Sequence, residues 1–170
     1  MLLQEMTWPE IGNLSRDIPV LVPVAALEQH GRHMPVFTDS LLLGEVVRRV
    51  GEAMTDRVLI APLMWLGNSH HHLDFQGTLS ASPRVYLDLL NDLAENLIAH
   101  GFRRIVFVNG HGGNITPGEA GHLRAPAATS RSRAICCCCS ASTGTKPTRT
   151  PAAPTWCSRR WVTPASGRRR

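Results

Sequence analysis

Short apolar runs alternate with longer amphipathic segments along the N-terminal two thirds of the chain. The runs at 18–24, 58–64 and 105–108 are rich in Val, Ile and Leu. Runs of this length and composition, bounded by turn-forming residues, predict buried strands. The third run leads directly into a glycine-rich stretch at 109–114.

Two amphipathic segments lie between these runs. Residues 40–54 and 82–100 place Leu and Val at helical spacing, which predicts two helices. Ser40 is the expected N-cap of the first helix. Pro83 at the first helical position and Gly101 after the last one mark the ends of the second.

Strands that are apolar throughout and alternate with helices indicate a parallel sheet covered on both faces. We therefore expect an α/β fold, a three-layer αβα arrangement with a mostly parallel central sheet. Ligands of such sheets bind outside the carboxyl ends of the strands. The polar loops 28–39, 69–77 and 109–114 each follow a strand, so their side chains should gather at one edge.

These loops are rich in groups that bind metal ions. Mixed carboxylate and imidazole ligands suit zinc or manganese, and two adjacent ions could share Asp39 as a bridge. Taken singly, each residue could instead be a cap or a loop hydrogen-bonding group, and the glycines of the third loop could cradle a phosphate. The candidates are Glu28, His30, His33, Asp39, His70, His71, His72, Asp74 and His111.

Three motifs appear in order along the chain: Glu-Gln-His-Gly-Arg-His-Met-Pro at 28–35 with Thr-Asp at 38–39, His-Leu-Asp-Phe-Gln-Gly-Thr-Leu-Ser at 72–80, and Asn-Gly-His-Gly-Gly-Asn at 109–114. Together they resemble the creatininase family, which includes creatinine amidohydrolase, a peptidase that trims a mycofactocin precursor, and a formamide hydrolase. The resemblance spans residues 18–117. It implies a metal-dependent amidohydrolase acting on a cyclic amide, a formamide or a peptide.

The resemblance also implies residue roles. Glu28, Asp39 and His111 match the ligands of one divalent ion, and His30 and the shared Asp39 match ligands of a second; the ions expected are zinc, manganese or both. His33 and His72 match recurrent pocket histidines, which implies a catalytic or substrate-side role. The family commonly forms hexamers, so a homo-oligomer is expected.

The chain departs from the family pattern at three positions. Gln76 stands where proline is common, His71 where Glu is common, and Gly113 where creatininase proper has a metal-binding Glu. The last departure disfavours creatinine as the substrate. The remaining acidic ligand should then come from a later family motif, Gly-His-Ala-Gly-Glu-x-Glu-Thr-Ser, which this chain does not spell.

The C-terminal third differs sharply in composition. All 13 Asp and Glu residues lie in residues 1–120, whereas 121–170 hold no acid and give the whole chain its net charge of +5. All five cysteines also lie there, four of them consecutive at 136–139, which does not suit a zinc site. With few aromatic residues and no apolar period, this tail offers no folded platform for nucleic acid or membrane. We expect neither partner.

Another reading frame accounts for this tail. Residues 161–170 can be back-translated so that a shifted frame reads Gly-His-Ala-Gly-Glu-Arg-Glu-Thr-Ser. We therefore expect a frameshift between about residues 115 and 134, leaving a creatininase-like domain at 1–120, incomplete at its C-terminal side, and a disordered basic tail at 121–170. The alternative is an authentic basic appendage.

The later family motif and the C-terminal side of the domain are expected to be needed for function. Catalysis should be impaired, and two other functions stay open: a non-catalytic metal-binding remnant, and a phosphate or nucleotide module that uses the glycine-rich loop but lacks a Walker lysine. The N-terminus has no basic segment followed by an apolar one, and no apolar run approaches membrane-spanning length. A cytoplasmic protein is expected.

Overall fold

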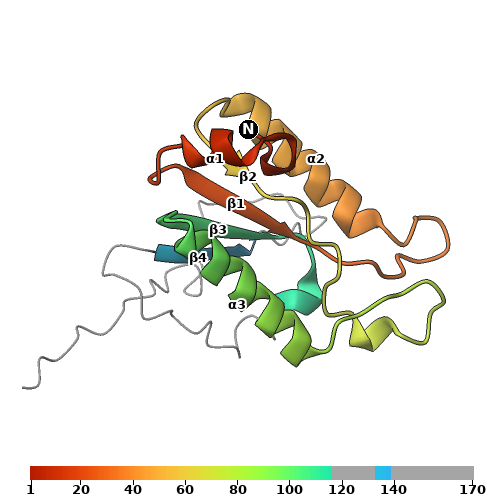
Figure 1. Cartoon of the computed structure of the whole chain (residues 1–170). Coiled ribbons are helices and arrows are strands. Elements are labelled where there is room, and N and C mark those ends of the chain that lie inside the picture. Colours follow the sequence, from red (N-terminus) through yellow and green to blue (C-terminus); the bar gives the residue numbers. More distant parts are fainter. Residues whose placement is uncertain (116–132, 139–170) are drawn as a thin grey trace, which may run out of the picture.

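The computed structural model describes residues 1–115 and the backbone of 133–138. Within these parts a parallel sheet has the strand order β2-β1-β3-β4 (Figure 1). The strands are β1 (Pro19–Val24), β2 (Leu59–Ile60), β3 (Arg104–Asn109) and β4 (Arg133–Cys138). The chain runs from β1 outward to β2 and then back across β1 to β3, so the crevice at which the strand order reverses lies between β1 and β3.

Helices cover both faces of this sheet. α2 (Thr38–Ala53) packs on one face, where Leu43 and Val47 meet Ile60, and α3 (Pro83–Ala99) packs on the other, where Tyr86 and Leu90 join a larger cluster. Figure 1 shows the two helices on opposite sides of the strands. The predicted three-layer α/β arrangement is confirmed.

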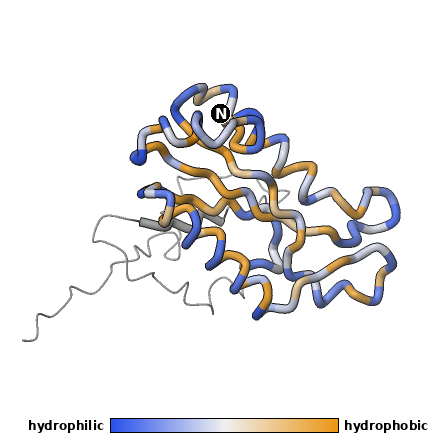
Figure 2. The backbone as a smooth tube through the Cα atoms, in the orientation of Figure 1, coloured by the Kyte–Doolittle hydropathy of each residue, from blue (hydrophilic) through white to orange (hydrophobic). Residues whose placement is uncertain are grey.

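The alternation of side chains along the strands explains why both faces are apolar. In β1, Val20, Val22 and Val24 belong to the α3-side cluster, while Leu21 between them packs on the α2 side. Successive side chains of a strand point to opposite faces, so a strand with a helix on each face must be apolar at every position. Figure 2 shows apolar colour along much of the strands, with hydrophilic colour mainly at their ends.

The boundaries of α3 agree with the sequence prediction. Ser82 is the N-cap and its side chain accepts a hydrogen bond from the backbone N–H of Val85 at 3.4 Å, with Pro83 as the first helical residue. Beyond the helix, Gly101 has a φ of 89°, a left-handed conformation that glycine adopts without steric cost.

The predicted N-cap of α2 is wrong. The helix begins at Thr38, and Phe37 at the N-cap makes no side-chain capping bond. Ser40 lies inside the first turn, buried, where its hydroxyl donates to the carbonyl of Ala26 at 2.8 Å. A tertiary contact to the loop after β1 therefore uses the side chain that local sequence assigned to capping.

The segment predicted as the second strand, 58–64, pairs over a shorter length. β2 itself is two residues, and Met64 adds an isolated bridge to Val24. On the outer side of β2, the amide of Ile60 donates to the carbonyl of Met1 at 2.9 Å, and the amino group of Met1 donates to Val58 at 3.1 Å. The N-terminal residues thus cover an edge that would otherwise be free to pair with another chain.

Two short helical segments connect this N-terminal edge to β1. They are the 3-10 helix η1 (Leu3–Glu5) and the helix α1 (Trp8–Gly12). Thr7 and Glu10 form a capping box at the start of α1, with the Thr7 amide donating to the Glu10 carboxylate at 2.7 Å. Within the described residues, no helix is long and apolar enough to cross a bilayer.

Residues 133–138 fall inside the segment that the sequence assigned to a disordered tail. There the backbone forms β4, which pairs in parallel with the whole of β3. The rest of the predicted tail, and most of the interval in which a frameshift was expected, lie outside the described residues.

Candidate metal centre

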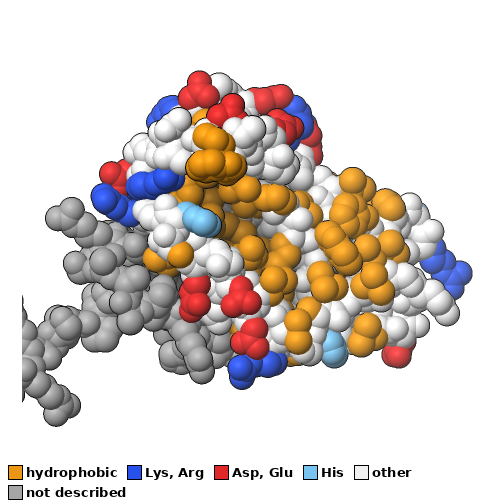
Figure 3. All heavy atoms as spheres, in the orientation of Figure 1, with side chains coloured by type: hydrophobic (Ala, Val, Ile, Leu, Met, Phe, Trp, Pro, Cys, Tyr) orange, Lys and Arg blue, Asp and Glu red, His pale blue; other side chains and the backbone are white. Residues whose placement is uncertain are grey.

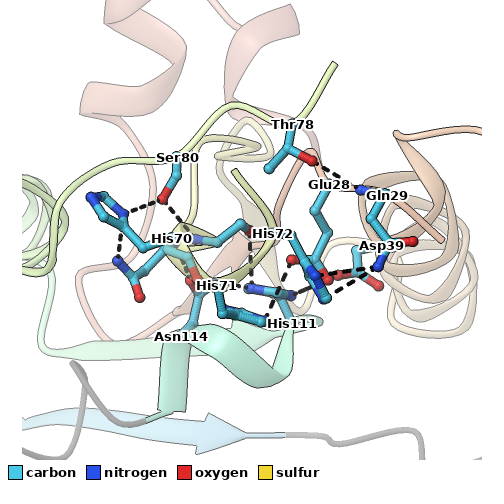
Figure 4. Close-up of polar contacts among 12 residues, drawn as sticks. Glu28, Gln29, Asp39, His70, His71, His72, Thr78, Ser80, His111 and Asn114 are labelled. Carbon is cyan, nitrogen blue, oxygen red and sulfur yellow. Dashed lines mark hydrogen bonds and ion pairs between the residues drawn. The ribbon is translucent and has the colours of Figure 1, made fainter. Parts of the chain in front are cut away.

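Asp39 lies between two imidazoles from different loops. Its Oδ1 lies 3.0 Å from Nε2 of His30, in the loop after β1, and its Oδ2 lies 2.8 Å from Nδ1 of His111, in the loop after β3 (Figure 4). Asp39 itself stands in the first turn of α2. The crevice between β1 and β3 thus brings together the two loops and the helix end that sequence alone could only place at a common edge.

A backbone carbonyl fixes the proton on each of these imidazoles. Nδ1 of His30 lies 3.2 Å from the carbonyl of Glu28, and Nε2 of His111 lies 3.0 Å from the carbonyl of Asn68. A carbonyl can only accept, so each of these ring nitrogens carries the hydrogen. In the neutral ring the other nitrogen then presents a lone pair to a carboxylate oxygen of Asp39. Two lone pairs repel unless a proton or a cation lies between them.

Glu28 is a further acidic group in this cluster, in contact with His111. Its side chain is 9% exposed, and its Oε1 lies 3.4 Å from Nδ1 of His111. Burial disfavours the charged form of His111, yet the hydrogen bond to Asp39 and the charge of Glu28 outweigh it and raise the pKa of His111 above its ordinary value. The site therefore attracts positive charge at the point where the two carboxylates and the imidazole converge.

The convergence of carboxylates and imidazoles at this point makes these residues suitable ligands for a divalent ion. Metal-bound histidines usually donate their second ring N–H to a carbonyl or carboxylate, as His30 and His111 do. Glu28, His30 and Asp39 also offer one ligand atom each within 4.8 Å of one another. The structure brings together all four predicted ligands, which are Glu28, His30, Asp39 and His111. Their role as metal ligands stays a prediction.

Buried asparagines hold the three loops in register. The side chain of Asn114 accepts from the amide of Asn68 at 2.9 Å and donates to the carbonyl of Ala25 at 3.0 Å and to Asn109 at 3.0 Å. Asn109 in turn accepts from the amide of His111 at 3.2 Å. Sequence reasoning missed these residues, although Asn109 and Asn114 bracket the third motif.

The three consecutive histidines form the 3-10 helix η2 (His70–His72). Such a helix has three residues per turn, so their side chains point in three directions. His70 turns to Ser80, with Nδ1 and Oγ 2.7 Å apart. His71 stacks on His111 with ring centroids 6.2 Å apart, and His72 lies against the amide of Gln29.

The two predicted catalytic histidines differ in their exposure. His72 is half-buried, whereas His33 is exposed on the loop after β1. Among the described residues no hydrogen bond or ion pair joins His33 to the cluster, and the amide nitrogen Nε2 of Gln29 lies 3.3 Å from Nδ1 of His72. Their catalytic or substrate-side role stays a prediction.

Close packing explains two glycines of the third loop. A Cβ at Gly113 would lie 2.4 Å from Nε2 of His111 and 2.3 Å from the carbonyl of Asn68, and one at Gly110 would lie 2.9 Å from Leu43. Side chains are excluded there because the loop passes tightly over the site. The glycines therefore require no phosphate to account for them.

The comparison with known families agrees with this arrangement. The model of the creatininase family, described as creatinine amidohydrolase, matches residues 4–158. The chain belongs to the creatininase family. This confirms the family that the three motifs suggested.

Relatives of this chain carry two kinds of name. A mycofactocin precursor peptide peptidase of Mycolicibacterium smegmatis is 39% identical over 100 residues, covering 56% of this chain and 40% of the relative. A creatinine amidohydrolase of Pseudomonas putida is 34% identical over 114 residues, covering 63% of this chain and 43% of the relative. The chain thus spans about two fifths of the length of the curated relatives it matches.

Solved creatininase structures share the fold. A creatinine amidohydrolase matches with a TM-score of 0.69 at 31% identity, covering 81% of this chain and 57% of that one. A manganese creatininase matches with the same TM-score of 0.69 at 30% identity, covering 81% and 57%. A creatininase variant described as a zinc–zinc type also matches, so members of the family hold divalent ions.

Proposed function

We propose that this chain carries the metal-binding centre of an amidohydrolase that cleaves a carbon–nitrogen amide bond in a peptide or a small amide. The main support for this proposal is that an imidazole lies beside each carboxylate oxygen of Asp39. Each has its outer nitrogen bonded to a backbone carbonyl and its inner nitrogen aimed at one oxygen of the same carboxylate. One carboxylate between two such rings is suited to bridge two cations.

Each residue would have a distinct role in binding the two ions. Glu28, Asp39 and His111 would hold one ion, and His30 with Asp39 would contribute to a second, zinc or manganese in each case. Such ions, when bound, supply Lewis-acid polarisation of a substrate carbonyl. The carbonyls of Glu28 and Asn68 keep the imidazoles in the orientation that binding needs.

Substrate contacts and proton transfer to the leaving nitrogen would fall to His33 and His72, the roles that the family resemblance implies. An imidazole suits this role because its pKa is near neutrality. Gly113 bears on the substrate class. Since a Cβ there would collide with His111, this backbone does not accommodate the Glu that the position holds in creatininase proper, which supports a peptide or another amide over creatinine.

Two other functions are weaker. A phosphate-binding module would rely on the glycines of the third loop, and the packing around Gly110 and Gly113 already accounts for those. A metal-binding remnant without catalysis would keep the same ligands. Impaired hydrolysis stays an expectation from the sequence, and the frameshift remains our explanation for residues 121–170.

Assembly and location remain proposals as well. α2 leaves Leu41, Leu42 and Val46 between 52% and 62% exposed, and Figure 3 shows apolar side chains gathered over a broad part of the face in view. Apolar surface of this extent supports a homo-oligomer, as expected for a hexameric family. A cytoplasmic location stays an expectation from the sequence.

Titration with Zn²⁺ and Mn²⁺ tests the proposal. Asp39→Asn should weaken binding by about 100-fold or more, because this carboxylate serves both ions and removal of even an outer partner costs 10–100-fold. His100→Ala, which changes an exposed histidine at the end of α3, should leave it unchanged. Equal affinities in the two variants would refute the site, and a metal-loaded chain that hydrolyses no peptide or amide would leave the remnant as the function.

A further inference from the structure

Glu28 faces two different imidazoles with its two oxygens. Oε1 lies toward His111, as described above, while Oε2 lies 3.9 Å from Nε2 of His71 in η2. Oε2 is buried and has no hydrogen-bond partner among the described residues. A buried carboxylate oxygen without a partner is costly and calls for an explanation. At 3.9 Å the contact with His71 is too long to be a hydrogen bond.

The Glu28 carboxylate also lies close to a second histidine. Glu28, His71 and His72 offer one ligand atom each, and these atoms lie within 4.8 Å of one another. The rings of His71 and His72 are 4.2 Å apart, centroid to centroid. Ligands of a tetrahedral zinc lie about 3.3 Å apart when each is about 2.0 Å from the metal, so a small closing movement would bring the three atoms around one ion.

His71 is placed to admit an ion from solvent. Its side chain is 52% exposed, whereas the carboxylate behind it is 9% exposed. His70, the third histidine of η2, points elsewhere and is bonded to Ser80. Figure 4 shows His70 turned to Ser80, and His71 and Glu28 near His111.

We propose that Glu28, His71 and His72 form a further metal-binding position beside the one at Asp39. Two imidazoles and one carboxylate select a borderline transition-metal ion such as Zn²⁺ or Co²⁺ over Mg²⁺ or Ca²⁺. Glu28 would then be shared between this position and the one at Asp39. With this position filled, His72 would be a ligand, and the substrate-side role proposed above would rest with His33.

Gln29 affects how strongly this position would bind a metal ion. Its Oε1 accepts from the amide of Gly31 at 2.8 Å, which turns its NH₂ group toward His72, with Nε2 and Nδ1 3.3 Å apart. The amide therefore competes with an ion for the acceptor nitrogen of His72. His71 has no such competitor among the described residues and is the stronger ligand of the two.

Cobalt titration of the full chain, followed by visible absorption, separates the two positions. In an Asp39→Asn background the position at Asp39 is disabled, and we expect one equivalent of Co²⁺ to remain bound. Adding His71→Ala should weaken that binding more than 10-fold, since loss of a direct ligand costs more than loss of an outer partner. Adding His70→Ala, the matched control in the same helix, should not.

The outcomes are distinguishable from those of the proposed function. If Asp39→Asn binds no Co²⁺, or if the His71 and His70 double variants bind it equally, the inference is overturned. If Asp39→Asn has the wild-type stoichiometry but His71→Ala loses one equivalent, the proposed function fails and this position stands. His71→Gln, which keeps the bulk of the side chain, and far-UV circular dichroism exclude loss of the fold as the cause.

Discussion

Asn114 connects three segments around the site through hydrogen bonds, so its replacement should lower both the stability of the protein and its metal affinity. The side chain is 3% exposed and joins the end of β1, the loop before η2 and the end of β3. Asn114→Ala deletes all three hydrogen bonds. Two backbone groups then lose their side-chain partner inside the protein: the amide of Asn68 and the carbonyl of Ala25.

The magnitude follows from these two groups. A buried polar group left without its partner costs about 1–3 kcal/mol, so the variant should lose about 2–6 kcal/mol of unfolding free energy. At roughly 4 °C per kcal/mol for a domain of this size, the midpoint should fall by about 10 °C or more. That loss is a large part of the total stability of a typical domain, about 5–15 kcal/mol.

Urea and thermal unfolding followed by circular dichroism measure this loss. Asn96→Ala, an exposed position on α3, is the control and should change stability by no more than about 0.5 kcal/mol. Asn114→Asp should not rescue the protein, because the carboxylate cannot donate to the carbonyl of Ala25. Zn²⁺ affinity should fall with Asn114→Ala, since Asn68 positions His111.

A loss below about 1 kcal/mol for Asn114→Ala, with unchanged Zn²⁺ affinity, would refute this reasoning. It would mean that solvent or a rearranged loop satisfies both backbone groups. The tie between the three loops would then be dispensable.

Other predictions concern the core, the surface and the gene. Phe107→Ala, at a position 1% exposed, should cost about 3–5 kcal/mol in urea unfolding, whereas Leu41→Ala, at 55% exposure, should cost far less. Two arginines on α2 lower the pKa of Glu45 from 4.5 to about 2; their stabilising effect should be complete above pH 4.5 and lost as pH falls toward 2, and a carboxyl NMR titration midpoint near 4.5 would contradict this. Sequencing the coding DNA over codons 110–170 should reveal the Gly-His-Ala-Gly-Glu motif in another frame, and its absence from every frame would make the tail authentic.

Local sequence was sufficient for the parts of the fold that depend on neighbouring residues. α3 follows from its apolar spacing, Ser82, Pro83 and Gly101, all of which act within a turn or two. The extent of β2 did not follow, because the N-terminal residues beside it are distant in sequence. Ser40 failed as a predicted cap for the same reason, since its partner Ala26 belongs to another loop.

The amino-acid sequence was enough to predict that carboxylates and histidines would meet at one edge of a parallel sheet, because parallel strands end together and each polar loop follows a strand. Which atoms face one another depends on how the loops pack in the folded protein. The tautomers of His30 and His111 depend on carbonyls brought near them by folding, and the directions of the η2 histidines depend on a 3-10 turn that spacing did not predict. Hydrogen bonds and ligand geometry act over about 3 Å, a distance that only the packed loops define.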